Sequence, residues 1–277
     1  MEQFKAEDWA DPNLSIHRFT EAMRFAYGSR TQLGDPEFLD NDVEAFETEM
    51  LDEEHVKAIV KRITDNRSHH PSYYNPYKVY TPDDHGTSHI VTTDHSGMAV
   101  SMTTTVNLLF GAEVMEPTTG IILNNEMNDF SIPGVSNEFG FAPSEANYIR
   151  PGKRPLSSMT PIIAEFPNGT LYAAIGAAGG SRIISATAQT LWHILDHDMT
   201  AAESLAYPRM HDQLAPDRVV LEKKFSKSVG DYLKEKGHHV EWADPGSSAV
   251  QCIKRHFDGS LEAASEPRQK NSAGYTV

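Results

Sequence analysis

The sequence predicts an α+β fold, because helical and strand-like segments both recur along its 277 residues. Apolar residues at helical spacing predict helices over 14–27, 53–63, 183–195 and 226–236. β-Branched residues on both sides of a turn sequence predict a β-hairpin over 90–105. Further strands are expected at 120–123, 171–175, 240–242, 249–254 and 261–264.

Composition excludes several classes of protein. A hydrophobic fraction of 39% is enough for a core, and no apolar run approaches the length of a membrane-spanning helix. The formal net charge of -15 argues against nucleic-acid binding through a basic surface. The single cysteine, Cys252, cannot form an internal disulfide, and we expect it to be buried in a strand. The first residues do not have the pattern of a signal peptide.

The junction between Gly86 and Thr87 is the first candidate catalytic feature. If the chain is cut there, Thr87 carries a nucleophilic hydroxyl and a free α-amine that can act as its base, because α-amines titrate near pH ~8. The alternative is that Thr87 only begins a strand. Strand alternation places Thr103, Thr105 and Asn107 on one face of the second hairpin arm. Such a polar face is costly to bury without partners or a ligand.

Two more polar segments are candidate binding sites. Glu126 and Asp129 stand among amides after an apolar run, and carboxylates so placed can receive an ammonium group. The alternative is a solvated loop that caps its own backbone. Ser157 and Ser158 lie between prolines and can donate hydrogen bonds to a carboxylate, although such a pair is also common in turns and helix caps.

A run of small residues around Gly179 and Gly180 joins a predicted strand to a predicted helix. Glycines at such a turn let backbone N–H groups approach a ligand, and the helix N-terminus adds positive potential. This arrangement suits an oxyanion hole. The run is neither a Walker A loop nor a dinucleotide-binding motif, because it lacks the spacing of both.

Together and in this order, the four segments resemble the small subunit of the γ-glutamyltranspeptidases, or glutathione hydrolases, of fungal type. The resemblance runs from Gly86 to Gly274 and Tyr275. It implies the αββα sandwich of the N-terminal-nucleophile hydrolases and a precursor that cleaves itself before a threonine. Residues 1–86 would then be the end of a large subunit with a linker, and 87–277 the small, catalytic subunit. The sandwich is expected to be incomplete, because most of the large subunit is absent.

The resemblance also implies roles for the motif residues. Thr87 would be the nucleophile released by cleavage after Gly86, with Thr105 supporting its amine, and Gly179 and Gly180 would form the oxyanion hole. The proposed receptor for the substrate's α-ammonium group is Asn107, Glu126 and Asp129, and that for its α-carboxylate is Ser157 and Ser158. We expect Thr87, Asp129, Ser157 and Gly180 to surround one pocket. The arginine with which the family binds this carboxylate has no match in this chain.

The implied chemistry is γ-glutamyl transfer from glutathione and similar compounds to water, an amino acid or a dipeptide, with no cofactor. Neither of the adjacent pairs, His69–His70 and His238–His239, predicts a metal site, since neighbours on a strand point to opposite faces. The expected protein partner is the rest of the large subunit, so the chain alone should have impaired activity and self-cleavage. The alternative is an inactive homologue that binds γ-glutamyl compounds or another chain. The family suggests the secretory pathway, the vacuole or the cell surface.

Overall fold

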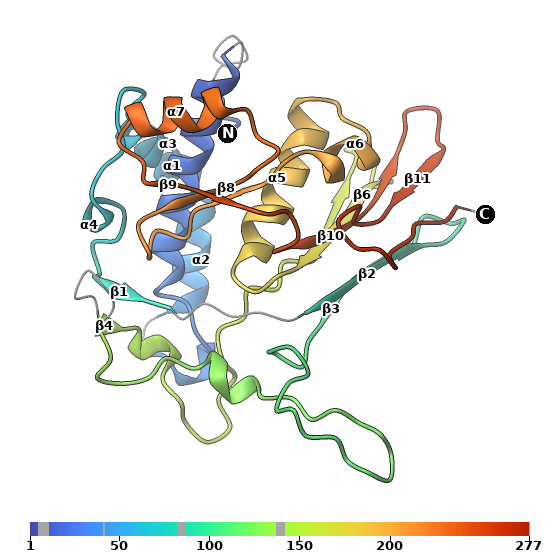
Figure 1. The fold of residues 1–277 in the computed structure, drawn as a ribbon, viewed down its shortest axis with the longest axis horizontal. Coiled ribbons are helices and arrows are strands. Elements are labelled where there is room, and N and C mark those ends of the chain that lie inside the picture. The colour runs from blue at the N-terminus through green and yellow to red at the C-terminus, as the bar shows by residue number, and fades with distance from the viewer. Residues whose placement is uncertain (5–10, 41, 82–86, 137–141, 277) are drawn as a thin grey trace. The chain divides into compact units, whose positions relative to one another are not determined.

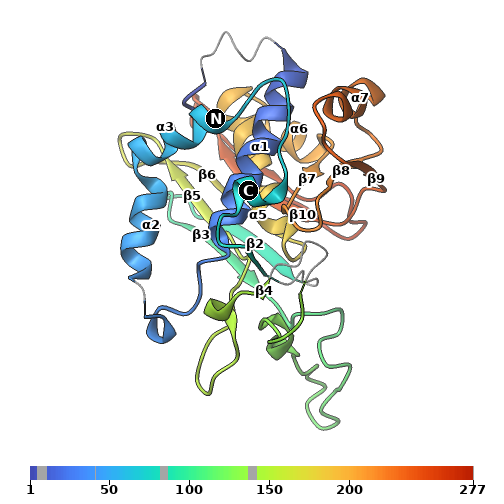
Figure 2. The same ribbon diagram turned by 90° about the vertical axis from the view of Figure 1, so that its left-hand side faces the viewer.

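The computed structural model describes all residues except 5–10, 41, 82–86, 137–141 and 277. The chain forms two compact units, and each is made of three separate stretches of sequence. The first unit comprises Met1–Pro82, Met127–Leu156 and Met210–Ala243. The second comprises Asp83–Glu126, Ser157–Arg209 and Asp244–Val277. Elements of both units are labelled in Figures 1 and 2.

The predicted hairpin is confirmed at the start of the second unit. Strands β2 (Ser88–Thr93) and β3 (Ala99–Thr104) pair antiparallel, with His89 opposite Thr103. The turn between them is held by the Asp94 carboxylate, which accepts hydrogen bonds from the backbone N–H groups of residues 96 and 98. The hairpin therefore fixes which side chains near Thr87 share a face.

A four-stranded antiparallel sheet forms the next layer of the second unit, in the order β11-β10-β6-β5. The strands are β5 (Ile162–Glu165), β6 (Leu171–Ala178), β10 (Ala249–Arg255) and β11 (Leu261–Ala264). The strands predicted at 171–175, 249–254 and 261–264 are thus confirmed. Cys252 is fully buried in β10, and this burial raises the pKa of its thiol.

Helices cover one face of this sheet and the hairpin covers the other, as Figures 1 and 2 show. Helices α5 (Arg182–Asp196) and α6 (Ala201–Ala206) bury Ile183 and Leu205 against Ile175 of β6. On the opposite face, the hydroxyl of Ser101 on β3 donates to the carbonyl of Ile175, 3.1 Å away. The second unit is therefore a stack of two β layers and one α layer.

The outer face of the hairpin is apolar and exposed. Ile90, Val100 and Met102 point away from the four-stranded sheet, and each has about half of its surface exposed, at 50%, 51% and 51%. Ile90 and Met102 lie directly opposite each other in the register, so these side chains form one patch.

The strand predicted at 120–123 is wrong. This segment belongs to an exposed loop in which Met115 and Ile122 make a single antiparallel bridge, and Ile121 is 59% exposed. The apolar run suggested a buried strand, but no other strand of the described chain extends this pairing. Hydropathy alone could not show that the segment lies outside the core.

The first unit is mainly helical. Its helices are α1 (Pro12–Arg30), α2 (Val43–Leu51), α3 (Glu53–Arg62), α4 (Pro71–Tyr74) and α7 (Lys227–Glu235), with short 3-10 turns at Pro36–Phe38 and Glu145–Asn147. Its strands are β1 (Val79–Tyr80), β4 (Ala142–Pro143), β7 (Met210–His211), β8 (Val219–Glu222) and β9 (Val240–Ala243). β1 pairs with β4, and β7-β8-β9 form a small sheet.

The long helix α1 is the centre of the first unit. Asp11 caps its N-terminus by accepting from the N–H groups of residues 13 and 14, and Pro12 occupies the first turn, where its missing N–H is harmless. Helices α3, α4 and α7 pack around it, so it buries charged residues as well as apolar ones. Among these, Arg24 donates to Asp212 at 2.9 Å and to Asp217 at 2.7 Å.

None of the helices in the described part of the chain combines the length and apolar content that a membrane crossing requires.

Candidate active site

Thr87 directly precedes β2 and is half-buried. It lines a hollow of about 1130 Å³ in the second unit, between β2, the strands β10 and β11, and the C-terminal segment 271–276. Ala178, the residue before Gly179, also lines this hollow, but of the predicted site residues only Thr87 does. The hollow is at least as large as a typical small-ligand site. Gly86, the other residue of the predicted cleavage site, lies outside the described residues.

Thr105 and Asn107 follow β3 in a tight turn, so they do not continue the strand face on which Thr103 lies. Asn107 has a positive φ of 73°, and its backbone N–H donates to the Thr105 hydroxyl oxygen at 2.7 Å. The buried Asn107 side chain donates to the carbonyl of Asn125 at 3.0 Å. The shared face expected from alternation is therefore wrong, because asparagine readily adopts the left-handed conformation that ends the strand here.

Glu126 and Asp129 begin and end one turn of 3-10 helix, η3 (Glu126–Asp129). Asn125, which bonds to Asn107, immediately precedes Glu126, so Thr105, Asn107 and Glu126 lie in one hydrogen-bonded part of the second unit. Asp129 is counted in the first unit, where its carbonyl accepts from the Asn147 amide at 2.7 Å. Its side chain is buried, at 6% exposure.

The two predicted serines lie in an irregular segment that leads into β5. Ser157 is exposed, and its hydroxyl oxygen accepts from the N–H of Met159 at 3.1 Å. Ser158 is buried at 5% exposure, and its carbonyl accepts from the Thr160 hydroxyl at 2.9 Å. The pair therefore lies in a loop braced by the hydroxyls of Ser157 and Thr160, and its role as a carboxylate receptor stays a prediction.

The two glycines form the bend between β6 and helix α5. Gly179 and Gly180 both have positive φ, 133° and 58°. A Cβ atom on Gly179 would lie 2.6 Å from the carbonyl oxygen of Ser247, so only glycine fits there. The backbone then enters a helix of 15 residues whose N-terminus adds positive potential at the bend.

His89 connects the strand of Thr87 to the strand that ends at these glycines. Its ring lies against Gly176 of β6, its Nδ1 is 2.8 Å from the Thr103 hydroxyl, and its Nε2 is 3.3 Å from the Ser101 hydroxyl. Burial lowers the pKa of His89 to about 4, so the ring is neutral at physiological pH. The only signal for this role in the sequence is the position of His89, two residues after Thr87.

Comparison with known proteins identifies the family. The profile of the family "Gamma-glutamyltranspeptidase" matches residues 1–276. The chain is 47% identical over 268 residues to a glutathione hydrolase proenzyme of Arthroderma benhamiae, covering 96% of this chain and 46% of that protein. It is 43% identical over 262 residues to a glutathione hydrolase of Aspergillus flavus, covering 94% of this chain and 44% of that protein. It therefore spans under half of the length of these relatives.

A solved structure shows the same relationship. The γ-glutamyltranspeptidase from Pseudomonas nitroreducens, complexed with L-DON, superposes with a TM-score of 0.62 at 38% identity, covering 69% of this chain and 99% of that one. This chain therefore belongs to the γ-glutamyltranspeptidase family, and its stacked layers are part of the N-terminal-nucleophile hydrolase fold.

Proposed function

We propose that this chain carries the catalytic part of an enzyme that hydrolyses glutathione and transfers γ-glutamyl groups, with Thr87 as its nucleophile. The observation that carries this proposal is the linkage through His89 in the second unit. The strand that begins after Thr87 is fixed, by the partly buried ring of His89, against the strand that ends just before Gly179. A nucleophile and an oxyanion hole need such mutual positioning.

In the proposed reaction, cleavage of the bond after Gly86 frees the amine of Thr87. The Thr87 hydroxyl attacks the γ-glutamyl amide carbon while the amine accepts its proton. The N–H groups of Gly179 and Gly180 stabilise the developing oxyanion. The leaving amine takes the proton, and water, an amino acid or a dipeptide then attacks the acyl-enzyme ester.

By the family resemblance, recognition of the donor is assigned to five polar side chains. Asn107, Glu126 and Asp129 hold the α-ammonium group, and Ser157 and Ser158 hold the α-carboxylate. Support comes from burial, since Asn107, Asp129 and Ser158 are exposed by only 3%, 6% and 5%. A substrate that lacks either charged group leaves buried polar atoms without their partners, so discrimination against it is strong.

We further propose that residues 1–86 are the end of a large subunit with its linker, and that 87–277 are the small subunit. The Pseudomonas chain supports this division. Its alignment covers 99% of that chain and 69% of this one, and residues 87–277 make up about the same fraction of this chain. The remainder of the large subunit is then the expected protein partner. The exposed apolar patch of Ile90, Val100 and Met102 is a surface suited to such a partner.

The decisive test supplies the part of a relative that this chain does not span. The chain would be co-expressed with the N-terminal half of the Arthroderma relative, and hydrolysis of a chromogenic γ-glutamyl anilide would be measured. Wild type and the control Thr170→Ala, a change on an exposed loop, are expected to turn over substrate, whereas Thr87→Ala is not. Mass spectrometry should find a fragment that begins at Thr87 in the active samples. Retention of turnover by Thr87→Ala would disprove the proposal, and substrate binding without turnover in wild type would favour an inactive homologue.

A further inference from the structure

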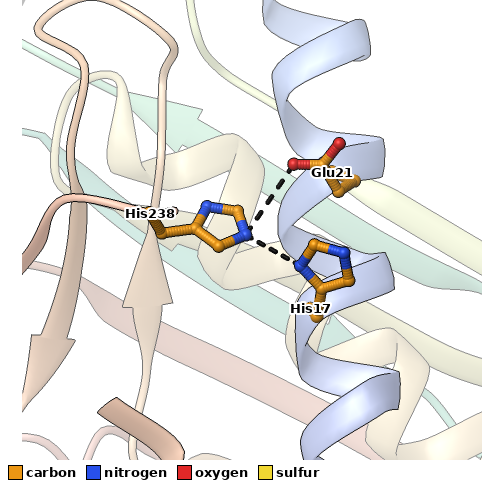
Figure 3. A group of neighbouring side chains, drawn as sticks. All are labelled: His17, Glu21 and His238. Carbon is orange, nitrogen blue, oxygen red and sulfur yellow. Dashed lines mark hydrogen bonds and ion pairs between the residues drawn. The ribbon is translucent and has the colours of Figure 1, made fainter. Parts of the chain in front are cut away.

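Three buried side chains with metal-binding groups converge in the first unit (Figure 3). His17 and Glu21 lie one turn apart on helix α1, and His238 comes from the segment between α7 and β9. One ligand atom of each lies within 4.8 Å of the others. Nδ1 of His17 is 2.8 Å from Nε2 of His238, which is 3.7 Å from Oε1 of Glu21. We call these three residues the His-Glu-His cluster.

The far side of His17 is held in the way that metal ligands are held. Its Nε2 lies 2.9 Å from the carbonyl oxygen of Thr64. Because a carbonyl can only accept, Nε2 carries the proton, and Nδ1 presents its lone pair to the centre of the His-Glu-His cluster. Histidine ligands of metals in proteins commonly donate their second N–H to a backbone carbonyl.

The carboxylate of Glu21 is held from behind by two hydroxyls. Tyr74 donates to Oε2 at 2.7 Å, and Ser68 donates to Oε1 at 2.7 Å. The Tyr74 oxygen itself accepts from the backbone N–H of His69 at 2.8 Å, so its proton is directed to Glu21. These bonds fix the orientation of the carboxylate and leave it able to bind a cation.

The charge of Glu21 has no fixed positive counterpart in the described chain. The guanidinium of Arg24, on the same helix, is bound by both Asp212 and Asp217, and that of Arg18 is bound by Asp65. His238 lies 3.7 Å from Glu21, but an imidazole ring carries no fixed charge. A buried carboxylate requires a compensating charge or a proton.

We propose that the His-Glu-His cluster is a structural binding site for a divalent transition-metal ion, with Zn²⁺ as the best match. Two imidazole nitrogens and one carboxylate oxygen are the donors that zinc accepts, whereas Mg²⁺ and Ca²⁺ favour oxygen ligands alone. The ion joins helix α1 to the segment after α7 and leaves one tetrahedral position for water. This site is independent of the proposed catalytic chemistry.

The spacing of the ligand atoms is compatible with this ion after a small adjustment. Ligand atoms about 2.0–2.2 Å from a tetrahedral zinc lie roughly 3.3 Å apart. Two of the three separations, 2.8 Å and 3.7 Å, fall on either side of this value, and the third is within 4.8 Å. The shorter one is also a hydrogen-bond distance, so in the metal-free protein His238 donates its Nε2 proton to His17. On binding, that proton moves to Nδ1 of His238 and the ion takes its place.

The test measures zinc bound by the full chain. Wild type would be dialysed against Zn²⁺ and analysed by elemental mass spectrometry, beside His17→Gln, His238→Gln and His239→Gln. His239 is the matched control, because it adjoins His238 but its side chain is 72% exposed. We expect wild type and the control to hold one ion more per chain than the other two variants, whose affinity at this site should fall at least about tenfold.

A second measurement needs no variant. Zinc at about 100 times its Kd should raise the Tm of wild type by at least about 4 °C, and a chelator should reverse the rise. Co²⁺ bound in place of zinc should give the visible absorption of a four-coordinate site in wild type. An unchanged Tm with zinc and chelator, or equal zinc content in His238→Gln and His239→Gln, would overturn the proposal.

Discussion

The imidazole ring of His89 occupies the space that a side chain on Gly176 would need, so a Cβ atom there would overlap the ring. Small residues on β6 thus allow the hairpin and the four-stranded sheet to approach closely, and the ring of His89 fills the contact. This contact links the start of β2 to the strand that leads to the glycine bend. It makes the two layers sensitive to the volume of one methyl group.

Gly176→Ala should therefore destabilise the protein by about 1–3 kcal/mol, because the new methyl group displaces His89. The measurement is urea unfolding followed by circular dichroism. The double variant Gly176→Ala with His89→Ala removes the ring that the methyl group would displace. Its loss in free energy of unfolding should be smaller than the sum of the losses in the two single variants. Strict additivity would show that the two residues do not compete for the same space.

Stability should fall as the pH is lowered through the range below about 6.5. The pKa of His89 is lowered to about 4 and that of His193 to about 3, so each ring takes up its proton more readily in the unfolded chain. Above pH ~6.5 both rings are neutral in the folded and in the unfolded chain. Below it, protonation of each ring in the unfolded chain can lower the free energy of unfolding by up to about 1.4 kcal/mol per pH unit. Urea unfolding of wild type and His89→Gln at pH 7 and pH 5 tests this. A difference between the two pH values that is as large in His89→Gln as in wild type would contradict the assignment to His89.

Arg24→Met should destabilise the protein by about 3–5 kcal/mol, because it leaves the fully buried carboxylate of Asp212 without its cation. Arg218→Met is the matched control. Arg218 pairs with Glu241 at 2.9 Å, but both side chains are well exposed, so its loss should cost about 0–1 kcal/mol. Thermal unfolding measures the stability that each variant loses. Similar losses in both variants would show that burial does not decide the strength of these ion pairs.

Gly179→Ala should reduce kcat of the assembled enzyme by about 100-fold or more, because the added methyl group clashes with the Ser247 carbonyl and moves the proposed oxyanion donors. Gly169→Ala is the control, since Gly169 also has a positive φ, 80°, but lies in the turn between β5 and β6, away from the hollow that Thr87 lines. It should lose stability but keep its kcat. An equal loss of kcat in both would point to general unfolding.

Much of the secondary structure follows from local pattern. The hairpin, the buried β6 and the helices α1, α5 and α7 lie where alternation and helical spacing predict them, because these signals reflect which face of each element is buried. The segment 120–123 failed this rule, since an apolar run can also lie in an exposed loop. The four motifs that indicated the family likewise needed no coordinates, because their residue types and order carry the resemblance.

The sequence by itself determined the family, the candidate nucleophile Thr87 and the small residues at the glycine bend. Only the tertiary structure brought His17 to His238, which are 221 residues apart, and placed His89 over Gly176. The local pattern of apolar and polar residues predicts whether a residue is buried, but it does not predict which distant residue it contacts. Such pairs are decided by the packing of whole elements, which depends on how their side chains fit together in space.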